Sequence, residues 1–339
     1  MAEHRLNVVV LAAGQGTRMR SRLPKVLHPL CGRSSLGHVL AAADALKPAR
    51  TVVVLASDTL EQVRQHFGPR YNYVVQRERL GTGHAVLQAH PLLGLLPGDV
   101  LVLYGDTPLL RAETARALVE ARRAQNASLA LLSFRADPPT GYGRVLRDVA
   151  GNVLALVEER NATPEQRAIT EANSGVMCFD GPWLWRHVHD IPLNTVKGEY
   201  YLTDLVSMAV AERGPGAVLA LPAADAREAW GINDRAQLAA AEAVIHERII
   251  ADLFQAGVSI TDPATTYVDA DVVVGADTSL LPGTLLQGTT RIGSGCEIGP
   301  HTTIRNSTVG DGARVRYAVV EHATVQTGED IGPFVHRTE

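Results

Sequence analysis

The stretch LNVVVLAAGQGTRMRSRLPKVLHPL, residues Leu6 to Leu30, joins an apolar run to a loop rich in glycine and arginine. The run is rich in β-branched valine and apolar on both faces, which indicates a buried strand. Small residues follow where the strand ends, and Lys25 lies beyond them. Two interpretations are open: a tight turn with a solvated basic flank, and a cradle for a polyphosphate.

Similar apolar runs recur along the first third of the chain and alternate with helix-like segments. The runs are TVVVLAS (51–57), YNYVVQ (71–76) and DVLVLYGD (99–106), and the helical segments include SLGHVLAAADAL (35–46) and LEQVRQHFG (60–68). This alternation predicts an α/β fold with a doubly wound, Rossmann-like and mainly parallel sheet. Ligands of such folds bind beyond the carboxyl ends of the strands. The small residues from Ala12 to Gly16 and the segment from Tyr104 to Asp106 would lie there.

The last third of the chain shows a different period. Apolar residues recur every six positions without a miss, and then continue with slips of one residue: Val268, Val274, Leu280, Leu286, Ile292, Ile298 and Ile304, followed by Val309, Val315, Val320, Val325 and Ile331. A period of six fits neither an amphipathic helix nor simple strand alternation. It predicts a β-solenoid whose flat faces are six residues apart.

Between these regions, residues 234–257 (DRAQLAAAEAVIHERIIADLFQAG) are rich in strong helix formers and end in glycine. This composition predicts a long helix with a glycine stop. We therefore expect a first domain over residues 1–235, a connecting helix over 236–256 and a repeat domain over 257–339. The alternative is that the helix packs as one more element of the first domain.

Composition narrows the classes of partner. The formal net charge of −4 in 339 residues offers no global basic surface for nucleic acid or an anionic membrane, although small anionic ligands remain compatible with it. Cys31, Cys178 and Cys296 form no C-x-x-C pair, which argues against a disulfide framework or a zinc site. No apolar run reaches the roughly 18 to 20 residues that span a bilayer, so we expect a cytoplasmic protein.

The opening loop has the chemistry of a phosphate site. Small residues allow backbone N–H groups to approach phosphate oxygens, and Thr17, Arg18 and Lys25 add a hydroxyl and two cations. The dinucleotide fingerprint G-x-G-x-x-G is absent because Met19 stands where glycine is required, which disfavours an NAD-binding oxidoreductase. A Walker A loop is also excluded, since no G-K-[ST] closes the motif.

Taken together, the motifs identify a family. LAAGQGTRMRSRLPKVLHPL resembles the signature of sugar-1-phosphate nucleotidyltransferases. Its continuation through QRERLGTGHA, LYGDTPLL, PTGYGR, VEE, EANSGV, GEYYLTD and WGIND resembles the group of bifunctional N-acetylglucosamine-1-phosphate uridylyltransferase/glucosamine-1-phosphate acetyltransferases. The resemblance covers essentially the whole chain, and it implies that residues 1–235 form the nucleotidyltransferase domain and the repeats a short left-handed parallel β-helix.

The resemblance also implies a set of substrate contacts. Leu11 to Gly14 would hold the nucleotide, residues 76, 81 and 82 would surround uracil, and the later motifs would hold the N-acetylhexosamine phosphate. The residues implied to bind substrate are Leu11, Ala12, Ala13, Gly14, Gly16, Thr17, Gln76, Gly81, Thr82, Tyr104, Gly105, Gly143, Glu158, Asn173, Tyr201 and Thr203. Gln76 and Glu158 each have a simpler alternative, as exposed polar residues on a solvated surface.

Asp106 ends an apolar run at the edge where the phosphate cradle is expected. A carboxylate there would repel an anionic substrate unless a divalent cation lay between them, and Mg²⁺ prefers such oxygen ligands. The resemblance makes Asn233 the second protein ligand of Mg²⁺. The alternatives are that Asp106 belongs to a turn before Pro108 and that Asn233 caps the helix beside Asp234.

The function implied is transfer of a uridylyl group from UTP to N-acetylglucosamine 1-phosphate, for the synthesis of cell-envelope precursors such as peptidoglycan. The attacking phosphate oxygen is ionised at neutral pH, so no general base is needed, and catalysis rests on positioning and charge neutralisation. Arg18 and Lys25 are the expected catalytic residues.

The repeats stop earlier than in longer members of the family, so we expect acetyl transfer to be absent and a homotrimer formed through the β-helix to be weakened. Two alternatives remain open. Another enzyme of the superfamily would use a different nucleotide or sugar phosphate, and a non-catalytic scaffold of this architecture would be expected to lose Arg18, Lys25 or Asp106.

Overall fold

The computed structural model describes residues 5–136 and 138–339, and this part of the chain divides into two compact units. The first unit comprises residues 1–28 and 35–235, and the second comprises residues 29–34 and 236–339. The second unit thus includes a short hairpin near the start of the sequence, between two segments that belong to the first unit.

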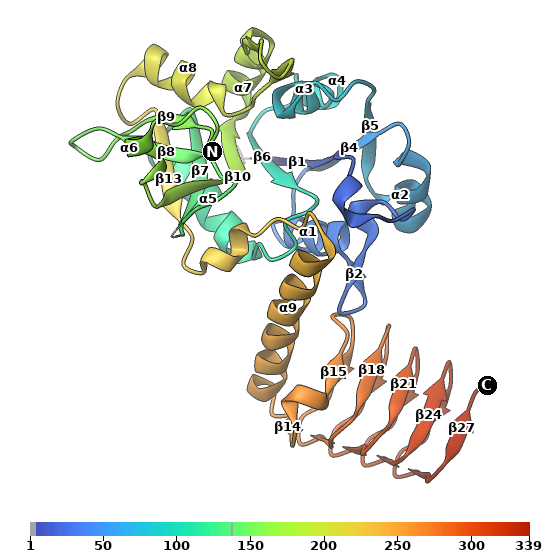
Figure 1. The fold of residues 1–339 in the computed structure, drawn as a ribbon. Helices are drawn as coiled ribbons and strands as arrows, with labels where there is room; N and C mark the ends of the chain where they lie inside the picture. Colours follow the sequence, from blue (N-terminus) through green and yellow to red (C-terminus); the bar gives the residue numbers. More distant parts are fainter. Residues whose placement is uncertain (1–4, 137) are drawn as a thin grey trace. The chain divides into compact units, whose positions relative to one another are not determined.

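A mostly parallel sheet forms the centre of the first unit (Figure 1). Its main path, in spatial order, is β13 (Val218–Pro222), β7 (Leu129–Arg135), β10 (Glu171–Asp180), β6 (Asp99–Tyr104), β1 (Leu6–Ala12), β4 (Arg50–Ala56) and β5 (Asn72–Gln76). The predicted α/β fold is confirmed. β10 runs antiparallel to both of its neighbours on this path, and it also pairs with β8 (Arg144–Arg147), which forms a hairpin with β9 (Val153–Val157).

Helices cover both faces of this sheet, which explains why its strands are apolar throughout. In β1, Val8 and Val10 pack on one side with α1 (Ser35–Asp44) and α5 (Ala112–Ala124), together with α2 (Leu60–Phe67). Val9 and Leu11 pack on the opposite side. That side is covered by α3 (Thr82–Leu87), α4 (His90–Leu93), α7 (Gly181–His187) and α8 (Asp204–Arg213). Alternate side chains of one strand therefore belong to different hydrophobic clusters.

The second unit starts with the hairpin of β2 (Pro29–Leu30) and β3 (Arg33–Ser34) and continues with the long helix α9 (Arg235–Gln255), at the place where the composition predicts a helix. The carbonyl oxygen of Cys31 accepts from Ala270 N at 2.8 Å, and Glu242 accepts from Cys31 N at 3.1 Å. Gly32 has φ +78°, and a Cβ there would lie 2.4 Å from Asp269 Cγ. Glycine is required for this approach.

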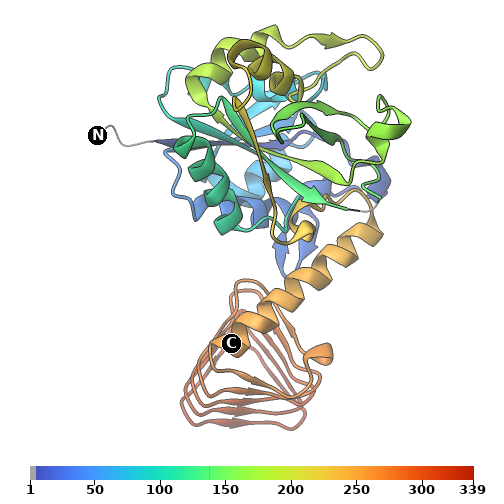
Figure 2. The same ribbon diagram turned by 90° about the vertical axis from the view of Figure 1, so that its left-hand side faces the viewer.

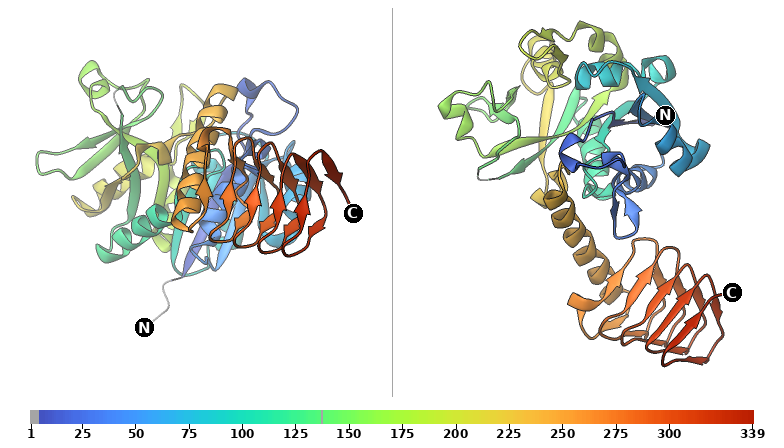
Figure 3. Two further views of the ribbon diagram at one scale, coloured as in Figure 1. Left: turned by 90° about the horizontal axis from the view of Figure 1, so that it is seen from below. Right: turned by 45° about the vertical axis from the view of Figure 1, so that its right-hand side comes forward.

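Residues 257–339, all described, wind into a prism with three parallel sheets (Figures 2 and 3). The first sheet holds β14 (Ser259–Ile260), β17 (Ser279–Leu280), β20 (Glu297–Ile298), β23 (Arg314–Val315) and β26 (Asp330–Ile331). The second holds β15 (Tyr267–Val268), β18 (Leu285–Gln287), β21 (Thr303–Arg305), β24 (Ala318–Glu321) and β27 (Val335–Arg337). The third holds β16 (Val273–Val274), β19 (Arg291–Ile292), β22 (Thr308–Val309) and β25 (Thr324–Val325). This is the predicted left-handed parallel β-helix.

Every apolar position of the six-residue pattern is buried in this prism. The slips have a simple cause: Leu286 pairs with Ile304, eighteen residues later, whereas Ile304 pairs with Val320, sixteen residues later. The later coils are therefore shorter at their corners. A second pattern was missed, because small residues that lie two positions before the apolar ones are also buried: Thr266, Thr278, Thr284, Thr290, Cys296, Thr302, Ser307, Ala313, Ala318 and Ala323.

Across the described residues, none of the helices is both long enough and apolar enough to span a bilayer. The three cysteines are buried and unpaired, as their spacing predicts. At Cys31, burial together with Glu242 and Asp269 raises the thiol pKa to about 12, so this thiol is neutral at physiological pH.

Candidate functional site

A cavity of about 280 Å³ lies in the first unit at the carboxyl ends of β1, β5 and β6. Its lining residues are Leu11, Ala13, Gly14, Gln76, Arg79, Gly81, Thr82, Ala85, Tyr104, Asp106, Glu199 and Tyr201. Most of them are residues for which the sequence predicts substrate or metal contacts. The strand order brings them together, because β1 lies between β6 and β4, and β5 pairs with β4.

The opening loop approaches the cavity through its glycines. A Cβ on Gly14 would meet nothing within 4 Å, so the space in front of this residue is open. Gly16 has φ +62°, and a Cβ there would lie 2.6 Å from Lys25 Cβ, so glycine allows the lysine to pack against the loop. Thr17 and Arg18 are exposed residues of the 3₁₀ turn Thr17–Met19 and do not line the cavity.

Lys25, Asp106 and Asn233 converge. The side chain of Lys25 is 9% exposed, and its ammonium group forms an ion pair with Asp106. It also donates to Asn233 Oδ1 at 3.4 Å. Asn233 is brought near because Ile232 N donates to the carbonyl oxygen of Asp106 at 2.8 Å. A carboxylate and an amide oxygen, 127 positions apart in the chain, therefore face one cation.

This pair of oxygens fits a hard divalent cation, since carboxylate and amide oxygens are its preferred ligands. Among the residues that the structure describes, no group of three or more His, Cys, Asp or Glu side chains is placed to hold a metal ion. A cation at Asp106 and Asn233 would thus have few protein ligands. That is typical of magnesium, which keeps waters and substrate phosphates in its shell.

Gln76 is 4% exposed, so its interpretation as an exposed polar residue is wrong. Its amide nitrogen donates to the carbonyl oxygen of Gly81 at 3.0 Å and lies 3.1 Å from His84 Nδ1. Both contacts use Nε2, and within residues 5–136 and 138–339 no partner is found for Oε1. Gln76 therefore presents a hydrogen-bond acceptor beside the cavity.

Gly81 closes this end of the site. Its φ is +94°, and a Cβ would lie 2.6 Å from the carbonyl oxygen of Tyr200, so the loop can pass here only with glycine. Thr82 Oγ1 accepts from Leu202 N at 3.0 Å. These contacts tie the start of α3 to the GEYYLTD segment, which also supplies Glu199 and Tyr201 to the cavity lining.

Residues implied to hold the sugar also lie close to one another. Asn173 N donates to the carbonyl oxygen of Gly143 at 2.8 Å, and a Cβ on Gly143 would lie 3.7 Å from Glu158 Oε1. Asn173 Oδ1 accepts from Gly175 N at 3.0 Å, at the irregularity where β10 leaves register with β7. Thr203 lies at the start of α8, where its carbonyl oxygen accepts from Val206 N.

Carboxylates gather on this side of the site. Burial raises the pKa of Glu158, and the neighbouring charges of Asp204 and Glu199 raise it further. Burial also raises the pKa of Asp204. For Tyr104, burial and then the charges of Asp106 and Glu158 raise the pKa, so its hydroxyl is neutral.

Some predicted contacts lie behind the cavity. Ala12 is buried, and a Cβ on Gly105 would lie 3.1 Å from Ala12 Cβ. Gly105 N donates to Leu11 O at 2.9 Å, and Gly105 O accepts from Ser35 Oγ at 3.0 Å. These two small residues fix the strand ends and do not line the cavity.

Arg79 and Glu199 line the cavity although sequence reasoning gave them no role. Both belong to motifs that carried the resemblance, QRERLGTGHA and GEYYLTD. The available signal was a charged residue inside a motif that supplies other residues to the cavity.

The chain is similar to known proteins over most of its length. Residues 8–175 match the family described as the MobA-like NTP transferase domain. Among curated relatives, the "Bifunctional protein GlmU" of Enterococcus faecalis is 41% identical over 328 residues, which cover 97% of this chain and 71% of that protein. The protein of the same name from Thermobifida fusca is 48% identical, and the match covers 94% of this chain and 66% of that protein. The one from Streptomyces avermitilis is 45% identical, and the match covers 97% of this chain and 69% of that protein.

Proposed function

The chain belongs to the GlmU family and carries a nucleotidyltransferase domain, and from this premise we propose that it transfers a uridylyl group from UTP to N-acetylglucosamine 1-phosphate. The products are UDP-N-acetylglucosamine and pyrophosphate. The observation that carries the proposal is the convergence of Lys25 and Asn233 with Asp106, which lines the same cavity as Gln76.

The reaction needs charge neutralisation more than proton transfer. A phosphate oxygen of the sugar phosphate attacks the α-phosphorus of UTP, and the bond from that phosphorus to the bridging oxygen of pyrophosphate breaks. Because the attacking oxygen is already ionised, no side chain has to remove a proton. Lys25, which packs against Gly16 of the opening loop, would offset charge on the α-phosphate and the leaving group. Arg18 would approach the phosphates from the exposed turn.

Asp106 and Asn233 would hold a divalent cation, for which we propose Mg²⁺, and it would supply positive charge beside the phosphates. Lys25 faces the same two oxygens. The charges of Lys25 and Asp106 cancel, so a divalent cation bound there would give the site a net positive charge. That arrangement supports a reaction between two anionic substrates.

Gln76 supports uridine over cytidine. Its free Oε1 can accept a hydrogen bond from the N3–H of uracil, whereas N3 of cytosine is itself an acceptor and would face this oxygen without a proton between them. A site that leaves a buried polar group unpaired with the wrong substrate discriminates strongly against it. The carboxylate of Glu158 and the amide of Asn173 would serve the sugar hydroxyls and the N-acetyl group.

We also propose that the β-helix supports a homotrimer. Outward-facing apolar residues on its faces, among them Tyr267, Val273 and Val319, are 57%, 49% and 38% exposed in the single chain. Association of copies through these faces would remove them from water. Light scattering over a range of concentrations tests this, and a constant monomer mass would contradict it.

The function is tested with a panel of substrates. We expect UTP with N-acetylglucosamine 1-phosphate to give the highest kcat/KM, CTP and purine nucleotides to react poorly, and a chelator to stop the reaction. A clear preference for another nucleotide or for a different sugar phosphate would support another enzyme of the superfamily. Folded protein that converts no combination would support the scaffold alternative.

A further inference from the structure

Arg79 links the ends of neighbouring strands at the candidate nucleotide site. It lies in the loop between β5 and α3, and its Nε donates to the carbonyl oxygen of Ala13 at 2.9 Å. Its Nη2 contacts both oxygens of Asp58, at 2.9 and 3.0 Å. Ala13 follows β1 and Asp58 follows β4, so one guanidinium group connects the carboxyl ends of β1, β4 and β5.

The contact with Ala13 determines how the next peptide group faces. In a planar trans peptide the carbonyl and the N–H point in opposite directions. When Arg79 binds the carbonyl oxygen of Ala13, the N–H of Gly14 is directed away from the guanidinium. No acceptor for that N–H is found among the described residues, and Gly14 is exposed and lines the cavity. The amide is thus left available to a ligand.

A contribution to folding stability does not explain the position of the Arg79 side chain. Asp58 is 68% exposed, and an exposed ion pair contributes little to folding. Yet the Arg79 side chain is 34% exposed and lines the cavity together with Gly14 and Gln76. Its Nη1 group has no acceptor in the described part of the chain. The Nε and Nη2 groups of the guanidinium are held by Ala13 and Asp58, which leaves the Nη1 N–H groups available to a ligand.

We propose that Arg79 is a positioning residue for the nucleotide: it orients the Ala13–Gly14 peptide toward the phosphates, and Asp58 fixes the guanidinium in that position. The inference rests on the proposed function only in naming UTP as the nucleotide. Because Arg79 acts on the nucleotide loop and contacts neither Lys25 nor Asp106, its loss raises the KM for the nucleotide and leaves the chemical step largely intact.

The test compares four variants. Arg79→Ala removes both contacts, Arg79→Lys keeps the charge but lacks the planar fork, and Asp58→Asn removes the charge that fixes the guanidinium. Arg77→Ala is the matched control, because Arg77 is an exposed arginine of the same loop outside the cavity lining. The measurements are the Kd for UTP by calorimetry with Mg²⁺ and without sugar phosphate, the KM for each substrate, kcat, and the melting temperature.

We expect Arg79→Ala to weaken UTP binding and raise its KM by about 10- to 100-fold, the range for a lost hydrogen bond to a charged group. Arg79→Lys and Asp58→Asn should fall between this variant and the wild type. The KM for the sugar phosphate and kcat should each change by less than about twofold. The melting temperature should change by no more than a few degrees. Arg77→Ala should match the wild type throughout.

An unchanged UTP affinity in folded Arg79→Ala protein would overturn the proposal. So would a fall in kcat with the nucleotide KM unchanged, or an equal effect of Arg77→Ala. If the wild-type protein instead binds another nucleotide of the panel, the proposed substrate is wrong and the same variants are measured with that nucleotide. If the wild type binds no nucleotide, both the proposed function and this inference fail.

Discussion

The cavity of the first unit and the β-helix of the second treat polar groups in opposite ways. In the β-helix, the buried hydroxyl of Thr290 donates to Gln287 O at 2.7 Å and lies 3.3 Å from Ile304 O, in the next coil. At the cavity, Gln76 Oε1 and Arg79 Nη1 have no partner in the described chain. Burial raises the pKa of Glu158, one of the residues implied to hold the sugar. Polar groups that repeat stabilise one another, whereas those left without partners are available to a ligand.

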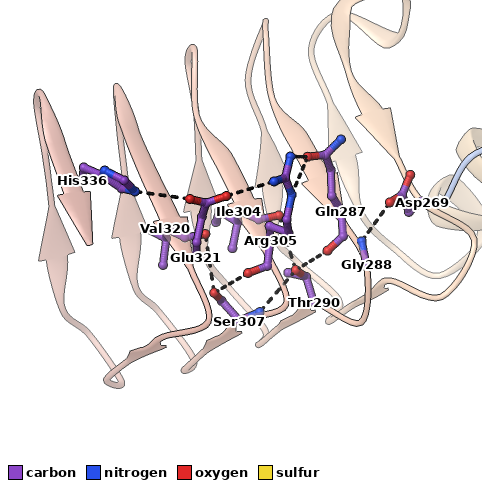
Figure 4. A network of polar contacts seen from close by, with 10 residues as sticks. All are labelled: Asp269, Gln287, Gly288, Thr290, Ile304, Arg305, Ser307, Val320, Glu321 and His336. Carbon is purple, nitrogen blue, oxygen red and sulfur yellow. Dashed lines mark hydrogen bonds and ion pairs between the residues drawn. The ribbon is translucent and has the colours of Figure 1, made fainter. Parts of the chain in front are cut away.

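The outer surface of the β-helix continues this pattern. Figure 4 shows Arg305 between Gln287 and Glu321, and His336 next to Glu321. These side chains lie on successive coils of one sheet and satisfy each other. Because they are largely exposed, each contact adds little stability. The apolar interior of the prism therefore accounts for stability, and the groups left without partners at the edge of the sheet are the candidates for chemistry.

The largest effect should come from Lys25→Ala, which removes the cation that is paired with Asp106 at the edge of the cavity. We expect turnover to fall by about 10²- to 10³-fold, as for other lost electrostatic stabilisers, while the melting temperature changes by no more than a few degrees. Steady-state kinetics and a melting curve on the same preparation measure both. Lys47→Ala, at an exposed lysine, is the control. Near-normal turnover in folded Lys25→Ala protein would contradict the proposal that this lysine serves the reaction and not stability.

The reverse effect is expected from Ile304→Ala inside the prism, where Ile304 is fully buried. Truncating a buried isoleucine costs about 2 to 5 kcal/mol of unfolding free energy. Val149→Ala, at a fully exposed valine of the first unit, should cost less than about 1 kcal/mol. Denaturant unfolding measures both, and kcat of the folded protein should not change. A fall in kcat below the melting transition would show that the β-helix takes part in the chemistry.

Asp106→Asn should raise the Mg²⁺ concentration needed for half-maximal rate by about tenfold or more, because the amide keeps an oxygen but loses the charge that holds the cation. Titration of the rate with Mg²⁺ measures this, and binding of Mn²⁺ followed by electron paramagnetic resonance gives a readout independent of turnover. If a chelator leaves the wild-type rate unchanged, Asp106 and Asn233 do not hold a required metal.

A smaller and pH-dependent effect is expected from Glu158→Gln. The pKa of Glu158 is raised in the folded protein, so its charged form opposes folding once the pH exceeds that pKa, and this cost disappears as the pH falls through it. Glu158→Gln should therefore melt higher than the wild type at pH 8 and no higher at pH 4. Its KM for the sugar phosphate should rise by about three- to tenfold at pH 8. Equal melting temperatures at pH 8 would contradict the buried-charge account.

Much of the fold follows from local patterns. β1 is predicted because alternate valines must be buried on both faces, and the β-helix because Val268 to Ile331 keep a period that other elements lack. The direction of β10 and the membership of Pro29–Ser34 in the second unit depend on long-range contacts, such as that of Cys31 with Ala270, which no local pattern encodes.

The candidate site is only partly predictable for a similar reason. Motifs place Gln76 and Asp106 at strand ends and Gly81 just before α3, and topology brings them to one cavity. The acceptor role of Gln76 depends on which of its amide atoms is already bound, and the position of Arg79 depends on a backbone carbonyl of another strand. Such contacts depend on the three-dimensional positions of other strands, so the type of residue alone does not predict them.

The most direct test is a single comparison of product formation. Wild-type, Lys25→Ala and Ile304→Ala proteins, each below its melting transition, are incubated with UTP, N-acetylglucosamine 1-phosphate and Mg²⁺, and UDP-N-acetylglucosamine and pyrophosphate are quantified together. We predict equal amounts of the two products, similar rates for the wild type and Ile304→Ala, and a rate about 10²- to 10³-fold lower for Lys25→Ala. Absence of UDP-N-acetylglucosamine with folded wild-type protein, or equal losses in the two variants, would contradict the account.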